Sequence, residues 1–129
     1  MNGQTARPEE NRIGGFLGIA AKAGKLIYGT ELCREAIRAG AGKKSPYLVL
    51  IANDAAEGTV KRIVNCCRYY EKEVRTLPLT ADALSHATGR PGLIACVALT
   101  DEGFAGAVKE RLDGKETKPG KSQQTEVDG

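Results

Sequence analysis

The sequence predicts an α/β fold in which helices cover both faces of a sheet of about four strands. Three observations support this prediction. Apolar residues alternate along the chain between helical spacing and short continuous runs. Two of those runs, residues 47–52 and 93–99, have the uninterrupted apolar pattern of strands that are buried on both faces. The chain has 129 residues, 41% of them hydrophobic, which is typical of one globular domain.

Up to residue 53, the pattern predicts a helix, a strand, a second helix and a second strand. The apolar residues that define these elements are, in chain order, Ile13, Phe16, Leu17 and Ala20; Leu26 to Tyr28; Cys33, Ala36 and Ile37; and Tyr47 to Ala52. Gly24 and Gly40 are expected to end the two helices, because glycine readily takes the left-handed conformation found at helix C-termini. Thr30 is the expected N-cap of the second helix.

Beyond residue 53, the pattern predicts helix, strand, helix, strand and helix. The residues that define them are Val60, Ile63, Val64, Cys67 and Tyr70; Val74 to Leu77; Ala83, Leu84 and Ala87; Leu93 to Leu99; and Phe104, Val108 and Leu112. Thr80 and Asp101 are the expected N-caps of the last two helices, and the strand at 74–77 is expected at an edge of the sheet.

The two ends of the chain are polar. Residues 1–11 are expected to form a disordered arm and residues 113–129 a disordered tail, which leaves one domain over residues 12–112. The N-terminal residues lack the apolar segment of a signal peptide, and no apolar run approaches the roughly 18 residues that cross a membrane. We therefore expect a cytoplasmic protein with no membrane partner.

Cofactors are not expected. The four cysteines, Cys33, Cys66, Cys67 and Cys96, form no CxxC pair, and His86 is the single histidine, so we predict reduced thiols and no metal site. The segment from Ile19 to Leu26 resembles the end of a phosphate-binding P-loop. It lacks both the first glycine and the final Ser or Thr of that motif, so no nucleotide cofactor is predicted.

Two aspartates, Asp54 and Asp101, each follow an apolar strand. Ligands of α/β proteins gather at such positions, but each Asp is also placed to cap the helix that follows it. No Ser-His-Asp or Cys-His arrangement is recognisable around the single histidine. We therefore do not expect an enzyme.

Positive charge is concentrated in the folded part of the chain. Residues 12–75 contain 12 Lys and Arg against 6 Asp and Glu, a net charge of +6. The basic residues at loops and helix starts include Lys22, Lys25, Arg34, Lys61, Arg62 and Arg90. Such a distribution favours an anionic partner such as nucleic acid, and the alternative is a solvated scatter of positive charge.

Several segments resemble the kink-turn-binding ribosomal proteins, the L-seven-Ae and L-thirty-e family. These segments are Gly18 to Leu26 with Gly29 and Thr30, and Leu48 to Ala56 with Thr59 to Arg62. Two more, Cys67 to Tyr70 and Asp101 to Ala105, are most similar to the bacterial YlxQ branch of that family. The resemblance spans about residues 12–112 and rests on the order and spacing of the segments together.

The resemblance implies a three-layer α/β/α sandwich with a central mixed sheet, and RNA binding. In the family, the second helix opens with Gly-Thr-Asn-Glu, followed three residues later by Lys, and an apolar loop before the last strand covers an extruded base. Gly29 and Thr30 match this pattern, whereas Glu31, Leu32 and Glu35 stand at the Asn, Glu and Lys positions. The two carboxylates are expected to weaken recognition of a kink-turn by repelling its phosphates.

We predict non-enzymatic binding of structured RNA, with ribosomal or kink-turn-like RNA as the expected target of a monomeric, ribosomal protein-like component of a ribonucleoprotein. No DNA partner is expected. The residues expected to contact RNA are Lys22, Lys25, Gly29, Thr30, Glu31, Arg34, Asn53, Asp54, Lys61, Arg62, Arg90, Pro91, Gly92 and Leu93. The alternative is a protein-interaction module that keeps the fold without a working RNA site.

Overall fold

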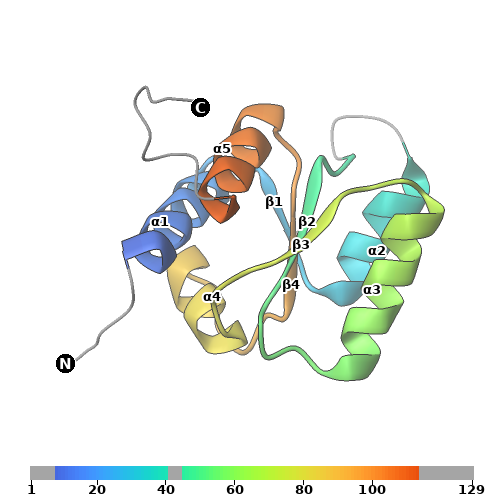
Figure 1. Cartoon of the computed structure of the whole chain (residues 1–129), viewed down its shortest axis with the longest axis horizontal. Coiled ribbons are helices and arrows are strands. Elements are labelled where there is room, and N and C mark those ends of the chain that lie inside the picture. The colour runs from blue at the N-terminus through green and yellow to red at the C-terminus, as the bar shows by residue number, and fades with distance from the viewer. Residues whose placement is uncertain (1–7, 41–44, 114–129) are drawn as a thin grey trace, which may run out of the picture.

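A computed structural model describes residues 8–40 and 45–113 and contains the predicted order of elements (Figure 1). In chain order the elements are α1 (Pro8–Lys22), β1 (Leu26–Tyr28), α2 (Thr30–Ala39), β2 (Leu48–Ile51), α3 (Glu57–Tyr69), β3 (Val74–Thr76), α4 (Ala81–Thr88), β4 (Cys96–Leu99) and α5 (Glu102–Leu112). The predicted arm overlaps α1, which begins at Pro8 because the proline backbone suits the first turn of a helix. The rest of that arm, and the tail after Asp113, lie outside the described residues.

The four strands form one mixed sheet in the order β1-β4-β2-β3. Strand β4 runs antiparallel to both β1 and β2, whereas β2 and β3 are parallel. Every residue of β2 and β4 is buried, as expected from their continuous apolar sequences. The prediction that these two strands are central, and that the strand after α3 lies at an edge, is confirmed.

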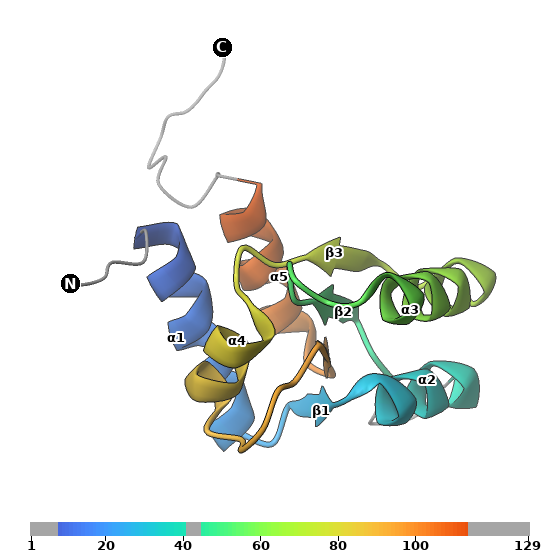
Figure 2. The ribbon, with the colours of Figure 1, turned by 90° about the horizontal axis from the view of Figure 1, so that it is seen from below.

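Helices cover both faces of the sheet, so the fold is the expected three-layer α/β/α sandwich. Figure 2 shows α1, α4 and α5 on one side of the sheet and α2 and α3 on the other. Successive residues of β2 point to opposite faces, so Leu48 and Leu50 enter the core beneath α1, α4 and α5. Val49 and Ile51 enter the second core, with Cys33 of α2 and the α3 residues.

Three loops emerge at one end of the sheet, the lower end in Figure 1. The backbone N–H of Gly29, just after β1, donates to the carbonyl of Cys96 at the start of β4 over 2.9 Å. Ile51, the last residue of β2, is also paired with Cys96. The loops that follow β1 and β2 therefore lie beside the loop that precedes β4, and this arrangement positions the candidate site.

Two of the predicted helix caps are confirmed and two are wrong. Thr80 Oγ1 accepts from the N–H of Ala83, and Asp101 Oδ2 accepts from the N–H of Phe104, both at 3.0 Å. Thr30 is instead the first residue of α2, and Gly29 occupies the N-cap position with φ 92°, a conformation that favours glycine. Asp54 does not cap α3, the helix that follows it, but binds the start of α4.

Strand β4 is shorter than predicted. It begins at Cys96 rather than Leu93, and Leu93 is 75% exposed. Its partner strands end there, because Tyr28 pairs with Val97 and Ile51 pairs with Cys96. Beyond them one backbone hydrogen bond, from the N–H of Ala52 to the Ala95 carbonyl at 2.8 Å, continues the pairing. The apolar sequence of residues 93–95 therefore belongs to the loop and leaves Leu93 available at its surface.

Candidate nucleic-acid interface

The loop before β4 folds back onto the start of α2. The guanidinium carbon of Arg90 lies 3.9 Å from the centroid of the Tyr28 ring, within the range of a cation–π contact. Tyr28 ends β1 and is followed directly by Gly29 and α2. The structure therefore brings together the two parts of the site that the sequence predicted separately.

A groove of about 440 Å³ lies between these parts. Its lining residues come from β1, from the first turns of α2 and from the loop before β4, and they are Leu26, Ile27, Tyr28, Leu32, Glu35, Ala36 and Arg90. The lining is mostly apolar, with one carboxylate and one guanidinium. Such a groove can hold a flat, weakly polar group such as a nucleobase while Arg90 faces a nearby phosphate.

The backbone at Arg90 is fixed by Ser85, the only buried polar side chain among the described residues. Ser85 Oγ donates to the carbonyl oxygen of Arg90, and the N–H of Arg90 donates to the Ser85 carbonyl at 3.0 Å. Gly89 ends α4 in the left-handed conformation, with φ 74°, and so turns the chain into the loop. Arg90, Pro91, Gly92 and Leu93 thus project from an anchored loop.

Lys22 lies on the other side of Gly89. It lines a second hollow, of about 370 Å³, together with Ile19, His86 and Gly89. Helices α1 and α4 approach closely here, because a Cβ added to Gly18 would lie 2.8 Å from the carbonyl oxygen of Ala87. Lys22 and Arg90 therefore flank the same loop and can supply positive charge on both of its sides.

The arginine at the start of α2 is already paired within the protein. Arg34 Nη1 forms an ion pair with the Glu31 carboxylate at 3.2 Å, and its Nε is buried without a hydrogen-bond partner. Glu35 adds a further exposed carboxylate to the groove. The predicted contacts Gly29, Thr30, Glu31 and Arg34 are thus assembled next to Arg90, but with more negative charge than phosphate binding favours.

The remaining predicted residues are placed differently. Asn53 and Asp54 follow β2 at the same end of the sheet, where the N–H of Asn53 donates to the Leu79 carbonyl at 2.8 Å. Lys25 lies at the opposite end of β1, where its carbonyl accepts from Thr100. Lys61 and Arg62 are exposed on α3, away from the groove lining.

Sequence reasoning missed Tyr28 and Ser85. Tyr28 belongs to a three-residue strand, and nothing in the sequence around it indicates a contact with Arg90, which reaches it from a distant loop. Ser85 lies within a helix whose apolar pattern makes it look like an ordinary polar position. The Tyr28 contact depends on tertiary packing, whereas the Ser85 contact is local and depends on how the chain turns after α4.

The thiols lie in the core behind the groove, where Cys33 Sγ donates to the carbonyl of Ile27, a residue of the groove lining. Cys33, Cys67 and Cys96 are buried in the core beneath α2 and α3. Burial raises the pKa of Cys67 to about 12. A hydrogen bond with Cys33, and then burial, raise the pKa of Cys96. Within residues 8–40 and 45–113, no group of three His, Cys, Asp or Glu side chains could hold a metal ion, and no helix is long and apolar enough to cross a membrane.

The fold and the groove define a class of small α/β/α sandwich with a composite surface between its second helix and the loop before its last strand. The chain belongs to the ribosomal protein L7Ae/L30e/S12e/Gadd45 family, whose sequence profile matches residues 12–109. The family resemblance seen in the sequence is therefore confirmed.

Two bacterial relatives are similar over most of their length. The RNA-binding protein YlxQ of Enterococcus faecium is 36% identical over 100 residues, which cover 77% of this chain and 89% of the relative. YlxQ of Bacillus subtilis is 33% identical over 98 residues, covering 76% of this chain and 92% of the relative. These matches place the chain with the YlxQ proteins, as its sequence indicated.

Solved structures give the same fold. A protein of unknown function from Bacillus halodurans C superposes with a TM-score of 0.71 at 25% identity, covering 79% of this chain and 97% of that chain. The 15.5kD RNA binding protein of Giardia lamblia superposes with a TM-score of 0.67 at 15% identity, covering 87% and 91% of the two chains. At that identity the second likeness concerns the fold alone.

Proposed function

We propose that this protein binds structured RNA and catalyses no reaction. The observation that carries the proposal is the position of Arg90, whose guanidinium lies on Tyr28 at the rim of the groove. A guanidinium held on an aromatic ring has a defined direction and keeps N–H groups available for phosphate oxygens. The names of the two YlxQ relatives, both RNA-binding proteins, support the same conclusion.

The proposed site has two functions. Arg90, Lys22 and the loop residues contact the phosphate backbone, which provides affinity that depends on salt. The apolar groove and the exposed side chain of Leu93 take an unstacked base, because specific RNA recognition targets bases that are splayed out of helices. The target is therefore a structured RNA that contains at least one unpaired nucleotide.

The finer expectations follow from the residues that depart from the family pattern. With Glu31, Leu32 and Glu35 at the family's base-reading positions, we propose that a kink-turn is bound less tightly than by proteins that keep the pattern. A ribosomal RNA, bound in the cytoplasm by a monomer as part of a ribonucleoprotein, remains the expected target. DNA is not an expected target, because the bases of a DNA duplex stay stacked and paired.

A second candidate function is a protein-interaction module. Leu32 and Leu93 are 57% and 75% exposed, and both lie beside the loop end of the sheet. Exposed apolar residues beside a groove also suit an apolar peptide. This alternative predicts that the protein has no affinity for nucleic acid. It also predicts that substitutions of basic residues leave the binding of an apolar peptide unchanged.

The two functions are separated by filter binding of the full chain to a mixture of structured RNAs at two salt concentrations. RNA binding predicts measurable affinity that falls as salt rises. Leu93→Ala should then weaken binding without changing the salt dependence, because Leu93 displaces no counterion. Absence of salt-sensitive affinity in the wild-type protein would rule out the proposed function.

A further inference from the structure

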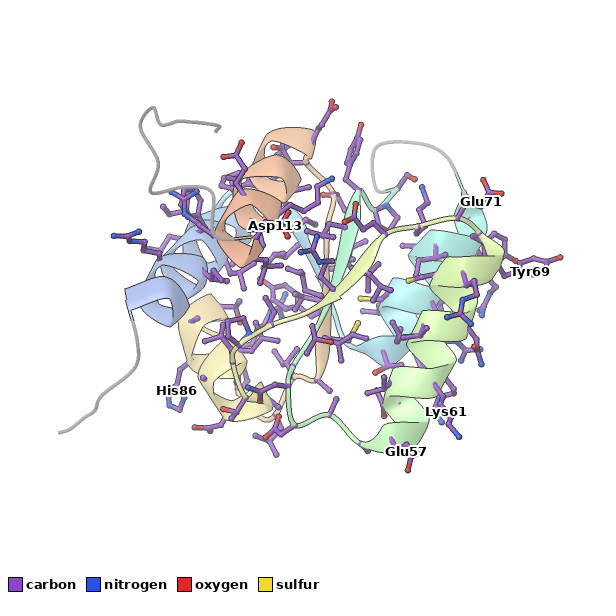
Figure 3. All side chains as sticks on the ribbon, in the orientation of Figure 1. Glu57, Lys61, Tyr69, Glu71, His86 and Asp113 are labelled. Carbon is purple, nitrogen blue, oxygen red and sulfur yellow. The ribbon has the colours of Figure 1, made fainter. Side chains whose placement is uncertain are left out.

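We propose that the outer face of α3 is a second RNA contact, where Lys61 and Arg68 bind phosphates and Tyr69 stacks on an unpaired base. The inference rests on the proposed function and extends it to a surface separate from the groove. Figure 3 shows Lys61 and Tyr69 on the side of α3 that faces away from the sheet.

Helical spacing aligns these residues in two rows. Lys61 and Arg68 are seven residues apart, as are Arg62 and Tyr69, and seven residues correspond to about two turns, or roughly 10 Å along the axis. All four side chains are exposed, whereas Ile63 and Cys67 on the opposite side of α3 are buried. The rows therefore form a continuous surface long enough to follow a short segment of RNA backbone.

The positive charge of this face is not neutralised within the protein. Among the residues that the structure describes, the side chains of Lys61, Arg62 and Arg68 form no hydrogen bond or ion pair. By contrast, Arg34 pairs with Glu31, and Lys109 pairs with Glu73 at 3.1 Å. From Lys61 to Tyr69 the helix has no acidic side chain, so the positive charge of this face is available to an anionic partner.

The acidic residue of α3 is in its first turn. Glu57 starts the helix, where a carboxylate interacts favourably with the partial positive charge of the helix N-terminus. Glu57 therefore has a structural role at the helix start, and the charged side chains of the turns that follow are all basic. Because Glu31 and Glu35 make the start of α2 acidic, α3 is better suited to provide the phosphate contacts that RNA affinity requires.

Tyr69 adds a surface for stacking. It is 80% exposed, and its ring contacts the Tyr70 ring edge to face, with centroids 4.8 Å apart and an angle of 76° between the planes. Tyr70 thus holds the Tyr69 ring while leaving most of it accessible. Exposed aromatic rings beside basic residues are the usual surface on which single-stranded bases stack.

The probe for this proposal is an RNA hairpin with a single-stranded 3′ overhang, and fluorescence anisotropy at several salt concentrations measures its binding to the full chain. The double substitution Lys61→Ala and Arg68→Ala should weaken binding and flatten the slope of log K against log salt by roughly 1.4–1.8 units, since two phosphate contacts are lost. Tyr69→Ala should weaken binding about fivefold or more with the slope unchanged, and Tyr69→Phe should bind like the wild type.

Two controls make the result specific. Lys109→Ala removes one positive charge from α5, on the other side of the sheet, where that charge is paired with Glu73, and should leave binding within about twofold of the wild type. An RNA whose overhang lacks bases should bind the wild type and Tyr69→Ala equally, because it has nothing to stack. Circular dichroism of each variant checks that the fold is retained, as expected for exposed positions.

The outcomes separate this inference from the proposed function. If the α3 double variant binds like the wild type while Arg90→Ala binds less tightly, the second contact is wrong and the proposed function stands. If Tyr69→Ala weakens binding equally with and without bases in the overhang, the stacking role is wrong. A wild-type protein with no salt-sensitive affinity for the hairpin overturns both proposals.

Discussion

The carboxylate of Asp54 accepts a hydrogen bond at 2.8 Å from the backbone N–H of Ala81, a residue 27 positions further along the chain. This contact satisfies one of the free N–H groups at the start of α4, while Thr80 satisfies that of Ala83. Through it, the loop after β2 is fixed to the helix that leads into the Arg90 loop. The aspartate at the end of the strand is therefore part of the support of the candidate site.

Replacing Asp54 by alanine should lower the free energy of unfolding by about 1 kcal/mol, because the N–H of Ala81 loses its acceptor. Asp54→Asn keeps a side-chain oxygen and should retain most of the stability. Urea denaturation followed by circular dichroism measures both variants. Equal stability of Asp54→Ala and wild type would show that the contact contributes nothing.

Ile51 tests the central position of β2. Its side chain is 2% exposed and lies in the core between the sheet and helices α2 and α3. Ile51→Asp would bury a charge with no partner and should reduce stability by more than roughly 3 kcal/mol. Ile51→Val should reduce it by only about 1 kcal/mol in the same denaturation experiment. A stable Ile51→Asp variant would contradict the assignment of this strand to the core.

The buried thiols predict a loss of stability in alkali. The pKa of Cys67 is raised from 9.0 to about 12, so the folded protein retains a proton that the unfolded chain releases in this range. The contribution of Cys67 to stability should therefore be constant below about pH 9 and be lost as the pH rises toward 12. The free energy of unfolding lost through this one group is at most about 1.4 kcal/mol for each pH unit.

Thermal unfolding between pH 8 and 11 measures this effect, with Cys67→Ala as the comparison. The variant should be less stable at neutral pH because of the cavity, but its stability should fall less steeply with pH. Alkylation of the native protein at neutral pH should modify Cys66, the thiol that is not fully buried, before the other three. Identical alkaline slopes for the two proteins would show that Cys67 is not responsible.

Glu31→Asn tests the effect of the ion pair at the start of α2. The substitution removes a carboxylate from the proposed site and frees Arg34, which is 3.2 Å from it. Binding of a kink-turn RNA should become tighter and its salt dependence steeper, because one more guanidinium can contact phosphate. Glu35→Gln removes the same charge without freeing an arginine, so it should strengthen binding with a smaller change of slope. Weaker binding of both variants would contradict the interpretation.

Much of the fold could be predicted from the sequence because local patterns specify it. The continuous apolar runs identified the two central strands, and Thr80 and Asp101 were recognisable as caps because each binds an N–H only three residues away. The strand at residues 93–99 was predicted too long. Its length depends on where β1 and β2 end, and apolar sequence alone does not carry that information.

The candidate site was predictable only in part. The basic loop and the start of the second helix were identified, but their contact depends on Tyr28, which meets a residue from a remote loop. Asp54 was assigned to the nearer helix for the same reason, since its actual partner is distant in sequence. Local spacing thus indicated which residues are chemically suited to the site, and only the tertiary packing determined which of them meet.

The most direct test of the central claim is the salt dependence of RNA binding by Arg90→Ala, measured by filter binding beside the wild type and Arg90→Lys. If Arg90 contacts phosphate, Arg90→Ala should bind less tightly, with the slope of log K against log salt reduced by roughly 0.7–0.9 units. Arg90→Lys should keep the slope because it keeps the charge, although it loses the planar contact with Tyr28. Unchanged affinity and slope for Arg90→Ala would contradict the account.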